Sequence, residues 1–287
     1  MEIEIRHPRS PEEFRYIEEI QRDAWGAPDI DITPTHVCVA TYLASRCVYI
    51  AFHRNKPIGF VWGMLGMQNG EIILHSHQLG VLREYQNKNV GFLLKLRQRE
   101  YALERGIRLI RWTFDPLQSR NAYFNFNKLG VICREYIVNL YGEIRDELNR
   151  GLPSDRLYVE WHIDTPRVHG RIKGRKPPAL EGLPRSIPII NRVEREHYFP
   201  RTTHVEMDLD DEFLLVEIPK NYIEIKSANP SLILDWRLKL REIFTEYLSR
   251  KYTIVDIITN EKKNRIFYVL SSANLEKILR EDWWEIL

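Results

Sequence analysis

The sequence predicts an α/β protein with a mixed sheet: a first domain over residues 1–165, a linker or extended loop over 166–203, and a smaller C-terminal α/β domain over 204–287. Three observations predict this organisation. Strand-like and helix-like runs alternate through the first 162 residues, a basic stretch with Gly and Pro follows, and a strand–helix–strand–strand order then begins at residue 212. A chain of 287 residues is also more typical of two domains than of one.

The N-terminal region contains a strand followed by two helices. Residues 2–6 alternate in polarity, as in a half-buried strand. The run Ser10-Pro11-Glu12-Glu13 has a capping residue, a proline at the first helical position and an acid at the third, which is a helix start. Thr33-Pro34 opens a second helix. The buried side of that helix is expected to consist of Val37, Ala40, Leu43 and Ala44.

Three strands follow. Residues 47–53 and 57–65 form a hairpin around Arg54-Asn55-Lys56. Asn69-Gly70 is a strong turn signal, because both residues tolerate the positive φ that a tight hairpin requires. The apolar run 72–81 after this turn is therefore the next strand.

The most informative segment is Gln86-Asn87-Lys88-Asn89-Val90-Gly91, which separates that strand from a helix over 92–105. The first N–H groups of a helix have no intrahelical partner, and the helix dipole favours negative charge there. A strand, a short polar loop with a glycine and a helix N-terminus together predict a binding site for pyrophosphate.

A second strand and helix follow this segment. The strand covers 107–114, the loop 115–118 and the helix 119–129, which ends at Gly130 as a natural cap.

The C-terminal block contains a strand at 212–218 and a long amphipathic helix at 231–250. Its remaining elements are strands at 252–258 and 265–269, joined by a turn at 260–264, and a helix within 272–287.

Composition limits the function classes. The net charge of +2 gives no bulk argument for nucleic acid or an anionic membrane, and no apolar run approaches the ~18 residues of a membrane helix. The three cysteines are widely spaced and match neither a disulfide framework nor a zinc pattern. We therefore expect a cytoplasmic protein.

Residues 1–162 resemble the GNAT acetyltransferase superfamily. Val81, Gln86, Asn89 and Gly91 have the spacing of its acyl-CoA signature, and the order of strands and helices is also similar. Asn89 departs from the family by replacing its usual first glycine, but Asn tolerates left-handed backbone better than other non-glycine residues. The C-terminal block resembles part of a second GNAT half. The closest similarity is to uncharacterised predicted acetyltransferases, and it is clearest at 113–122.

The resemblance implies a GNAT fold that uses acetyl-CoA as co-substrate. Backbone N–H groups at 87–92 would cradle the pyrophosphate, and the end of the preceding strand would pair with pantetheine. Asn121 resembles an Asn that commonly contacts CoA, although helix capping explains it equally well. The implied binding residues are Leu79, Val81, Gln86, Asn87, Lys88, Asn89, Val90, Gly91, Phe92 and Asn121.

His75 and His77 are the candidates for the catalytic base. They are two apart on a strand, so both point to one face, and a neutral imidazole is a suitable proton acceptor near pH 7. With Leu79 and Val81, they also resemble the paired histidines of arylalkylamine N-acetyltransferases. Two alternatives remain open: ordinary hydrogen-bonded sheet histidines, and a metal site.

The candidate for the general acid is Tyr123. Many GNAT enzymes have a Tyr where this chain has Phe126, which lacks a hydroxyl. Tyr123 lies one helical turn earlier and is the first substitute, with packing as its alternative role; Cys133, Tyr85 and Tyr141 are weaker candidates. Asp115 is a candidate for binding the acceptor amine, with turn formation as the alternative.

The resemblance therefore implies an acyl-CoA-dependent N-acetyltransferase that moves an acetyl group to an amine by direct transfer in a ternary complex. The alternative is a non-catalytic acyl-CoA-binding or interaction protein on a GNAT scaffold, which Asn89 and Phe126 motivate. A third hypothesis, nucleic-acid binding, depends on the basic stretch 167–176. The acceptor stays open, no membrane partner is expected, and an exposed sheet edge would suit a homodimer.

Overall fold

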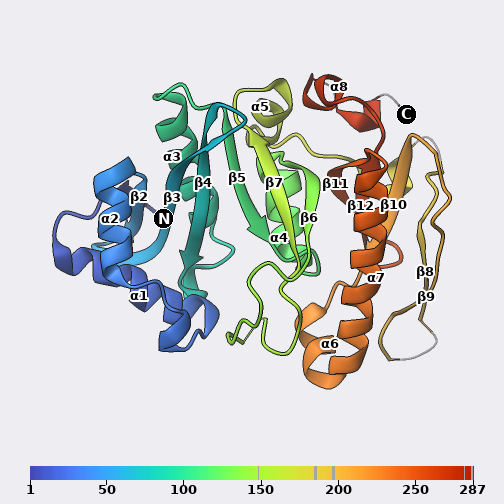
Figure 1. Ribbon diagram of the computed structural model, residues 1–287, viewed down its shortest axis with the longest axis horizontal. Helices are drawn as coiled ribbons and strands as arrows, with labels where there is room; N and C mark the ends of the chain where they lie inside the picture. The colour runs from blue at the N-terminus through green and yellow to red at the C-terminus, as the bar shows by residue number, and fades with distance from the viewer. Residues whose placement is uncertain (148, 184–185, 196–197, 281, 286) are drawn as a thin grey trace. The chain divides into compact units, whose positions relative to one another are not determined.

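The computed structural model of the protein describes residues 1–147, 149–183, 186–195, 198–280, 282–285 and 287. The chain divides into two compact units: unit 1, Met1–Trp112 with Ile144–Arg150, and unit 2, Thr113–Glu143 with Gly151–Leu287. Both units contain strands and helices (Figure 1), so the predicted α/β class is confirmed. The predicted domains, 1–165 and 204–287, divide the chain at other positions than these two units. Their boundaries stay a prediction.

Unit 1 is a sheet with helices on both faces. Its strands lie in the order β1-β2-β3-β4-β5, antiparallel except for the parallel pair β4 and β5. Its strands are β1 (Glu4–Arg6), β2 (Val48–His53), β3 (Lys56–Gln68), β4 (Glu71–Val81) and β5 (Leu109–Phe114), of which the last two residues belong to unit 2. Its helices are α1 (Pro11–Trp25), α2 (Thr35–Ser45) and α3 (Val90–Leu103).

Alternation along the strands decides which helix covers which face. Even-numbered side chains of β2 and β3, from Val48 to Trp62, pack in one cluster with Phe14 and Ile17 of α1 and with Cys38 of α2. Odd-numbered side chains face α3, where the Tyr49 and Tyr101 ring centroids are 6.4 Å apart. The two faces of β4 therefore lie in different surroundings.

The local signals read from the sequence are confirmed. Ser10 caps α1, and its Oγ accepts a hydrogen bond from Glu13 N at 3.4 Å. The turn between β2 and β3 has positive φ at Arg54 and Asn55, and the turn between β3 and β4 has φ of 50° and 81° at Asn69 and Gly70. These are the backbone conformations that tight hairpins require.

The predicted buried side of α2 is wrong. Leu43 is 68% exposed, whereas Cys38, Thr41 and Ser45 are buried. Ser45 Oγ donates to Thr41 O at 2.9 Å and also lies 3.2 Å from Gly63 O on β3. Small side chains that can bond to the backbone let this helix approach the sheet closely, and hydrophobicity alone does not show that preference.

Unit 2 contains a second sheet region, with strand order β7-β6-β11-β12-β10, and a separate pair, β8 and β9. Its strands are β6 (Ile132–Ile137), β7 (Arg156–His162), β8 (Asn191–Glu194), β9 (Arg201–Val205), β10 (Phe213–Ile218), β11 (Thr253–Asn260) and β12 (Arg265–Ser271). Its helices are α4 (Ser119–Tyr123), continued by a π-helical turn at Phe124–Leu129, α5 (Pro166–Ile172), α6 (Tyr222–Ala228), α7 (Pro230–Ser249) and α8 (Leu275–Arg280).

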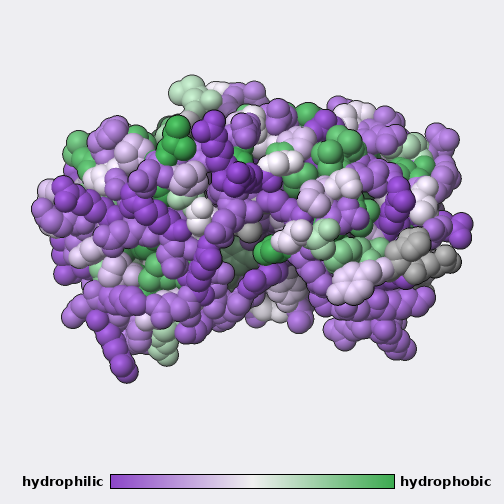
Figure 2. Space-filling view, turned by 90° about the horizontal axis from the view of Figure 1, so that it is seen from below, coloured by the Kyte–Doolittle hydropathy of each residue, from purple (hydrophilic) through white to green (hydrophobic). Residues whose placement is uncertain are grey.

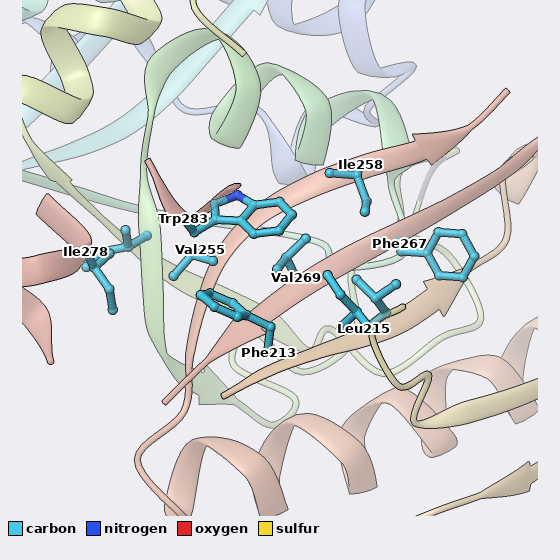
Figure 3. Packing of buried hydrophobic residues seen from close by; sticks show 10 residues of the cluster. Phe213, Leu215, Val255, Ile258, Phe267, Val269, Ile278 and Trp283 are labelled. Carbon is cyan, nitrogen blue, oxygen red and sulfur yellow. The ribbon is translucent and has the colours of Figure 1, made fainter. Parts of the chain in front are cut away.

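A hydrophobic cluster holds the C-terminal strands together. Alternate residues of β10, β11 and β12 point to one side, where Trp283 and Ile278 cover them (Figure 3). The predicted pairing of two strands around 260–264 is the antiparallel pair β11 and β12. The predicted helix within 272–287 is α8; residues 281 and 286 of that segment lie outside the described residues.

The segment 166–172 is not the exposed loop that the sequence predicted. It forms α5, in which Arg167 and Arg171 are 3% and 2% exposed. Arg167 donates to backbone carbonyls, and Arg171 forms an ion pair with Asp256. Side chains held in this way cannot contact phosphates, whereas Lys173, Arg175 and Lys176 of the same basic stretch are exposed, so the nucleic-acid hypothesis loses two of its five cationic residues and stays a prediction. Residues 184, 185, 196 and 197 of the predicted linker lie outside the described residues.

On the side seen in Figure 2, hydrophilic residues predominate and hydrophobic ones form small scattered groups. No helix in the described parts of the chain is long and apolar enough to cross a membrane.

Candidate functional site

The central feature of unit 1 is a β-bulge in β4. Trp62 of β3 pairs with Gln78, and the next residue, Gly63, pairs with Ser76, so His77 is an extra residue without a partner on β3. A bulge of this kind bends a strand and re-aims its side chains. Both predicted base residues therefore lie at an irregular point of the sheet.

Beyond the bulge, one edge of β4 has no neighbouring strand. The parallel ladder with β5 consists of Leu74↔Ile110 and His75↔Arg111, whereas β4 continues to Val81. From Ser76 onward, that edge of the strand has no strand partner among the described residues. Its backbone groups can pair with an extended ligand, as predicted for Leu79 and Val81.

Two glycines allow close packing on the two faces of this strand. A Cβ at Gly59 would lie 3.1 Å from Val90 Cγ1, at the start of α3, and 3.0 Å from Gly80 O. A Cβ at Gly80 would lie 2.6 Å from the Phe60 ring, on the face covered by α1 and α2. A side chain at Gly59 would therefore crowd the N-terminus of α3, and one at Gly80 would displace the Phe60 ring.

The turn before α3 has the left-handed backbone that the resemblance to the family requires at Asn89. Asn87 and Asn89 have φ of 63° and 62°, so the residue that replaces the family's glycine does adopt a left-handed backbone. The first intrahelical bond runs from Leu93 N to Asn89 O, and the N–H groups of residues 90–92 precede it. The helix thus presents backbone donors and a positive dipole end at the turn.

Two side chains of the turn have visible roles. Gln86 Nε2 donates to Val81 O at 3.3 Å, which ties the turn back to the end of β4. Lys88 is exposed, and its Nζ lies 5.0 Å from the centroid of the Tyr85 ring. Lys88 therefore has its charge at the same turn as the helix N-terminus.

The structure brings His75 and His77 together, with ring centroids 6.0 Å apart. The His77 ring also lies 4.5 Å from the Trp62 ring, on the face covered by α1 and α2. Burial, the neighbouring His77 and the charges of Lys95 and Arg111 lower the pKa of His75 to about 4, and burial lowers the pKa of His77. Both imidazoles are therefore neutral at pH 7.

Lys95 is a residue of this region that the sequence did not reveal. It lies in the middle of α3 and is 3% exposed. Its Nζ donates to Ser76 Oγ at 2.7 Å and to Gln98 Oε1 at 3.2 Å, and lies 3.5 Å from the centroid of the Trp112 ring. Ser76 stands between the two histidines, so this network reaches the bulge from the opposite face of β4.

The remaining predicted residues lie in unit 2. Asn121 Nδ2 donates to Gln118 Oε1 at 2.7 Å, a local contact of the start of α4. Tyr123 is partly buried at the end of α4. Phe126 is fully buried, and its ring lies 5.8 Å from that of Tyr268. The roles of Asn121 and Tyr123 stay predictions.

Asp115 does not bind an acceptor amine. It is 3% exposed, and its carboxylate accepts from Arg237 Nη2 at 2.5 Å and from Leu117 N at 2.8 Å. The alternative role in the turn is therefore correct. Asp115 is occupied by a buried arginine that is far away in the sequence.

Two of the thiols are not activated, and the described residues hold no metal cluster. Cys38, Cys47 and Cys133 are buried and not disulfide-bonded. Burial raises the pKa of Cys38 to about 12 and of Cys47 to about 11, so both stay protonated. Within the described parts of the chain, no group of three or more His, Cys, Asp or Glu residues could hold a metal ion.

Comparison with known proteins defines the class. Residues 14–130 match the model of the acetyltransferase (GNAT) family, and this segment contains the bulged strand, the left-handed turn and α3. The fold and this match define residues 14–130 as a GNAT acetyltransferase domain, as the motifs in the sequence predicted.

Several solved structures are similar to this chain. One is a chain of the NatC complex bound to Gag peptide and CoA (15% identity, 56% of this chain, 99% of that chain, TM-score 0.47). Another is Naa50 from Arabidopsis thaliana in complex with a bisubstrate analogue (15%, 55%, 97%, 0.45). A third is the PaiA N-acetyltransferase from Thermoplasma acidophilum in complex with coenzyme A (20%, 56%, 99%, 0.40). No curated protein matches the sequence.

Proposed function

We propose that the protein is an acetyl-CoA-dependent N-acetyltransferase that transfers the acetyl group directly to an amine in a ternary complex. The observation that carries the proposal is the arrangement of β4 and α3. The strand edge from Ser76 to Val81, the left-handed turn at Asn89 and the unbonded N–H groups of α3 follow one another. An extended thioester with a pyrophosphate at one end needs this sequence of donors and acceptors.

The turn and the strand edge have separate tasks in this proposal. The N–H groups of Val90, Gly91 and Phe92 bind the pyrophosphate, and the exposed ammonium of Lys88 adds a charge contact. The free edge at Leu79 and Val81 pairs with the amide groups of the pantetheine. Gln86 keeps the turn attached to β4 through its bond to Val81 O.

Of the two histidines, His77 is the better base. A general base works best when its pKa is near the operating pH, and a pKa of about 4 makes His75 a weak acceptor. His77 is more exposed, and its pKa is lowered by burial alone. His77 therefore takes the proton. The His75 ring beside it stays neutral, so it adds no positive charge that would disfavour protonation of His77.

The transfer step conserves its atoms and charges. The amine nitrogen forms a bond to the thioester carbonyl carbon, the carbon–sulfur bond breaks, and the amine proton passes to the His77 imidazole. The sulfur leaves as a thiolate and takes a proton from solvent. Phe126 cannot supply that proton, since it has no hydroxyl.

Titration calorimetry with acetyl-CoA tests this proposal first. We expect micromolar binding that weakens at least about 10-fold in Gly91→Glu, because a carboxylate at a helix N-terminus competes with the pyrophosphate. Gly66→Glu is the matched control: Gly66 is exposed on β3, and the nearest atom to its Cβ would be 3.7 Å away. Binding in this control should equal that of the wild type.

An acceptor screen then separates catalysis from binding. Consumption of acetyl-CoA with an amine acceptor supports the enzyme. Binding without turnover across small amines, amino acids, peptides and proteins would favour the non-catalytic acyl-CoA binder. No binding at all would contradict both.

A further inference from the structure

A buried lysine, Lys95, contacts the strand residue between the two histidines. The buried face of α3 consists of Val90, Leu94, Lys95, Gln98, Tyr101 and Ala102. Lysine is almost never fully buried, because transferring its charge out of water costs several kcal/mol, whereas Leu or Met would cover the same face without that cost. The position of Lys95 therefore requires a reason other than packing.

The partners of Lys95 include three acceptors. Its Nζ reaches the Ser76 hydroxyl, the Gln98 carbonyl oxygen and the face of the Trp112 ring. Burial lowers the pKa of Lys95 well below its usual range, and Cys47 opposes that shift. Gln98 is itself held, since its Nε2 lies 3.6 Å from Cys47 Sγ.

Lys95 connects the elements at the point where the sheet opens. Ser76 is the β4 residue between the two histidines and the last before the bulged His77. Trp112 follows Arg111, the last β5 residue paired with β4 in unit 1. A single side chain from α3 thus contacts β4 and β5 just as their ladder ends.

The surrounding backbone is packed for this contact. A Cβ at Gly63 would lie 2.7 Å from His75 O and 3.1 Å from Gln98 Nε2. Gly63 therefore leaves room for Gln98 under the bulge. Without a fixed partner, a bulge can move along its strand, and a shift of one residue would turn the histidines to the other face.

We propose that Lys95 is a positioning residue for acetyl transfer, which anchors the bulge through Ser76 and thereby fixes where His75 and His77 point. This inference rests on the proposed function. In this role, Lys95 acts by holding the backbone between the two histidines. A displacement of about 1 Å in such a group can lower turnover about 100-fold.

Kinetics in two backgrounds test the inference. Lys95→Met keeps the length of the side chain and removes the charge and both hydrogen bonds. We expect kcat to fall about 30- to 100-fold in the wild type but less than about 3-fold in His75→Ala/His77→Ala, because a positioning residue acts only through the groups that it positions. The assay is run at about pH 9, where part of the acceptor is already neutral.

The controls separate positioning from folding. Gln21→Met removes another buried side chain of unit 1, which bonds to Thr33 N at 2.8 Å, and any effect on kcat should be equal in both backgrounds. The affinity for acetyl-CoA should stay within about 2-fold in Lys95→Met, and hydrogen exchange should accelerate at Ser76–Gln78 but not at Ile73 or Leu74. If Lys95→Met does not fold, Ser76→Ala removes one bond of the network and should show the same dependence on the histidines, with a smaller decrease.

The outcomes are distinguishable. An equal loss of kcat in both backgrounds, or no loss in the wild type, would overturn the positioning role while leaving the proposed function intact. A wild type that binds acetyl-CoA and acetylates no acceptor would remove the proposed function, and this inference with it.

Discussion

The two units bury positive charge in different ways. In unit 2, Arg171 and Arg237 are almost completely buried, and each donates to a buried carboxylate, Asp256 and Asp115 respectively. In unit 1, Lys95 is equally buried but has a hydroxyl, an amide oxygen and an aromatic ring as its partners. The unit 2 arginines thus pair with carboxylates, whereas the partners of Lys95 include neutral groups, so the two kinds of site differ in what they contribute.

The difference also lies in what the partners join. The ion pair of Asp115 with Arg237 spans 122 residues of sequence, and that of Arg171 with Asp256 spans 85. Such pairs fasten distant segments of unit 2 to one another. Lys95 and Ser76 are 19 residues apart, and their contact fixes a local irregularity at the predicted active site. We therefore expect unit 2 pairs to control stability and the unit 1 cation to control turnover.

The largest effect on stability should come from Asp256→Asn. Asp256 is fully buried and also accepts from Asn127 Nδ2 at 2.8 Å and from Trp283 Nε1 at 3.0 Å. Removing its charge takes the nearer carboxylate from Arg171, which keeps Asp282 at 3.7 Å, and also removes the counter-charge 3.9 Å from the buried Arg167, so the free energy of unfolding should fall by about 3 kcal/mol. Urea denaturation measures this loss.

The exposed pair of Lys277 and Glu212 provides the control for Asp256. Lys277→Gln should cost less than about 1 kcal/mol, because solvent screens that pair. A cost below about 1 kcal/mol for Asp256→Asn as well would contradict the fastening role of the unit 2 pairs.

In unit 1, His75→Ala/His77→Ala should reduce turnover rather than stability. We expect kcat at pH 7 to fall at least about 100-fold, because a positioned general base contributes about that much or more. Affinity for acetyl-CoA should change less than about 2-fold. Steady-state kinetics and calorimetry measure the two effects, with His204→Ala, an exposed histidine of unit 2, as the control. Wild-type turnover in the double variant at neutral and high pH would show that neither histidine is the base.

The pH dependence sharpens the link between Lys95 and the histidines. Because the pKa of His77 is lowered, its ring stays neutral in mildly acidic solution, and the acidic limb of kcat/KM should lie below the ordinary histidine pKa of about 6.5. The pKa of His75 is about 4, mainly through burial, with smaller contributions from His77, Lys95 and Arg111. Removing the positive charge in Lys95→Met should raise that pKa, as NMR titration of the His75 ring would show.

The same shifts give the sign of a stability effect. Between about pH 4 and 6.5, the unfolded chain binds protons at these rings that the folded chain does not bind. Stability should therefore decrease as the pH falls through this window. A histidine pKa of 6.5 or above in the folded protein would contradict both expectations.

The smallest effect should be that of Lys95→Met on stability. The variant loses two hydrogen bonds and gains relief from the cost of burying a charge, so the free energy of unfolding should change by less than about 1.5 kcal/mol. Urea denaturation beside Asp256→Asn gives the direct contrast. A loss as large as that of Asp256→Asn would erase the distinction between the two units.

Much of unit 1 could be predicted because its signals are local. Ser10, Asn69-Gly70 and the alternation of the strands each fix a backbone conformation within a few residues, and each is confirmed. The left-handed backbone at Asn89 belongs to the same class. Its effect on ligand binding depends on contacts that no sequence pattern contains.

The errors involve partners that are distant in the sequence. The basic residues of α5 look like a solvated stretch until Asp256, 85 residues after Arg171, is placed beside them. Asp115 looks like a candidate for binding an amine until Arg237 occupies it. Lys95 was missed because a lysine in a helix is ordinarily exposed, and the sequence does not show which face of α3 is covered. The roles of charged residues are therefore the hardest to predict from the sequence.

The bulge at His77 has a consequence for insertions and deletions. Because His77 has no partner on β3, removing this one residue would leave every residue pair of β3 and β4 in place, together with the Asn69-Gly70 turn. The regular ladder that results keeps the hairpin and the helix start after it. We therefore expect a deletion of three nucleotides to remove the proposed base and to leave a folded protein that keeps the proposed site for acetyl-CoA.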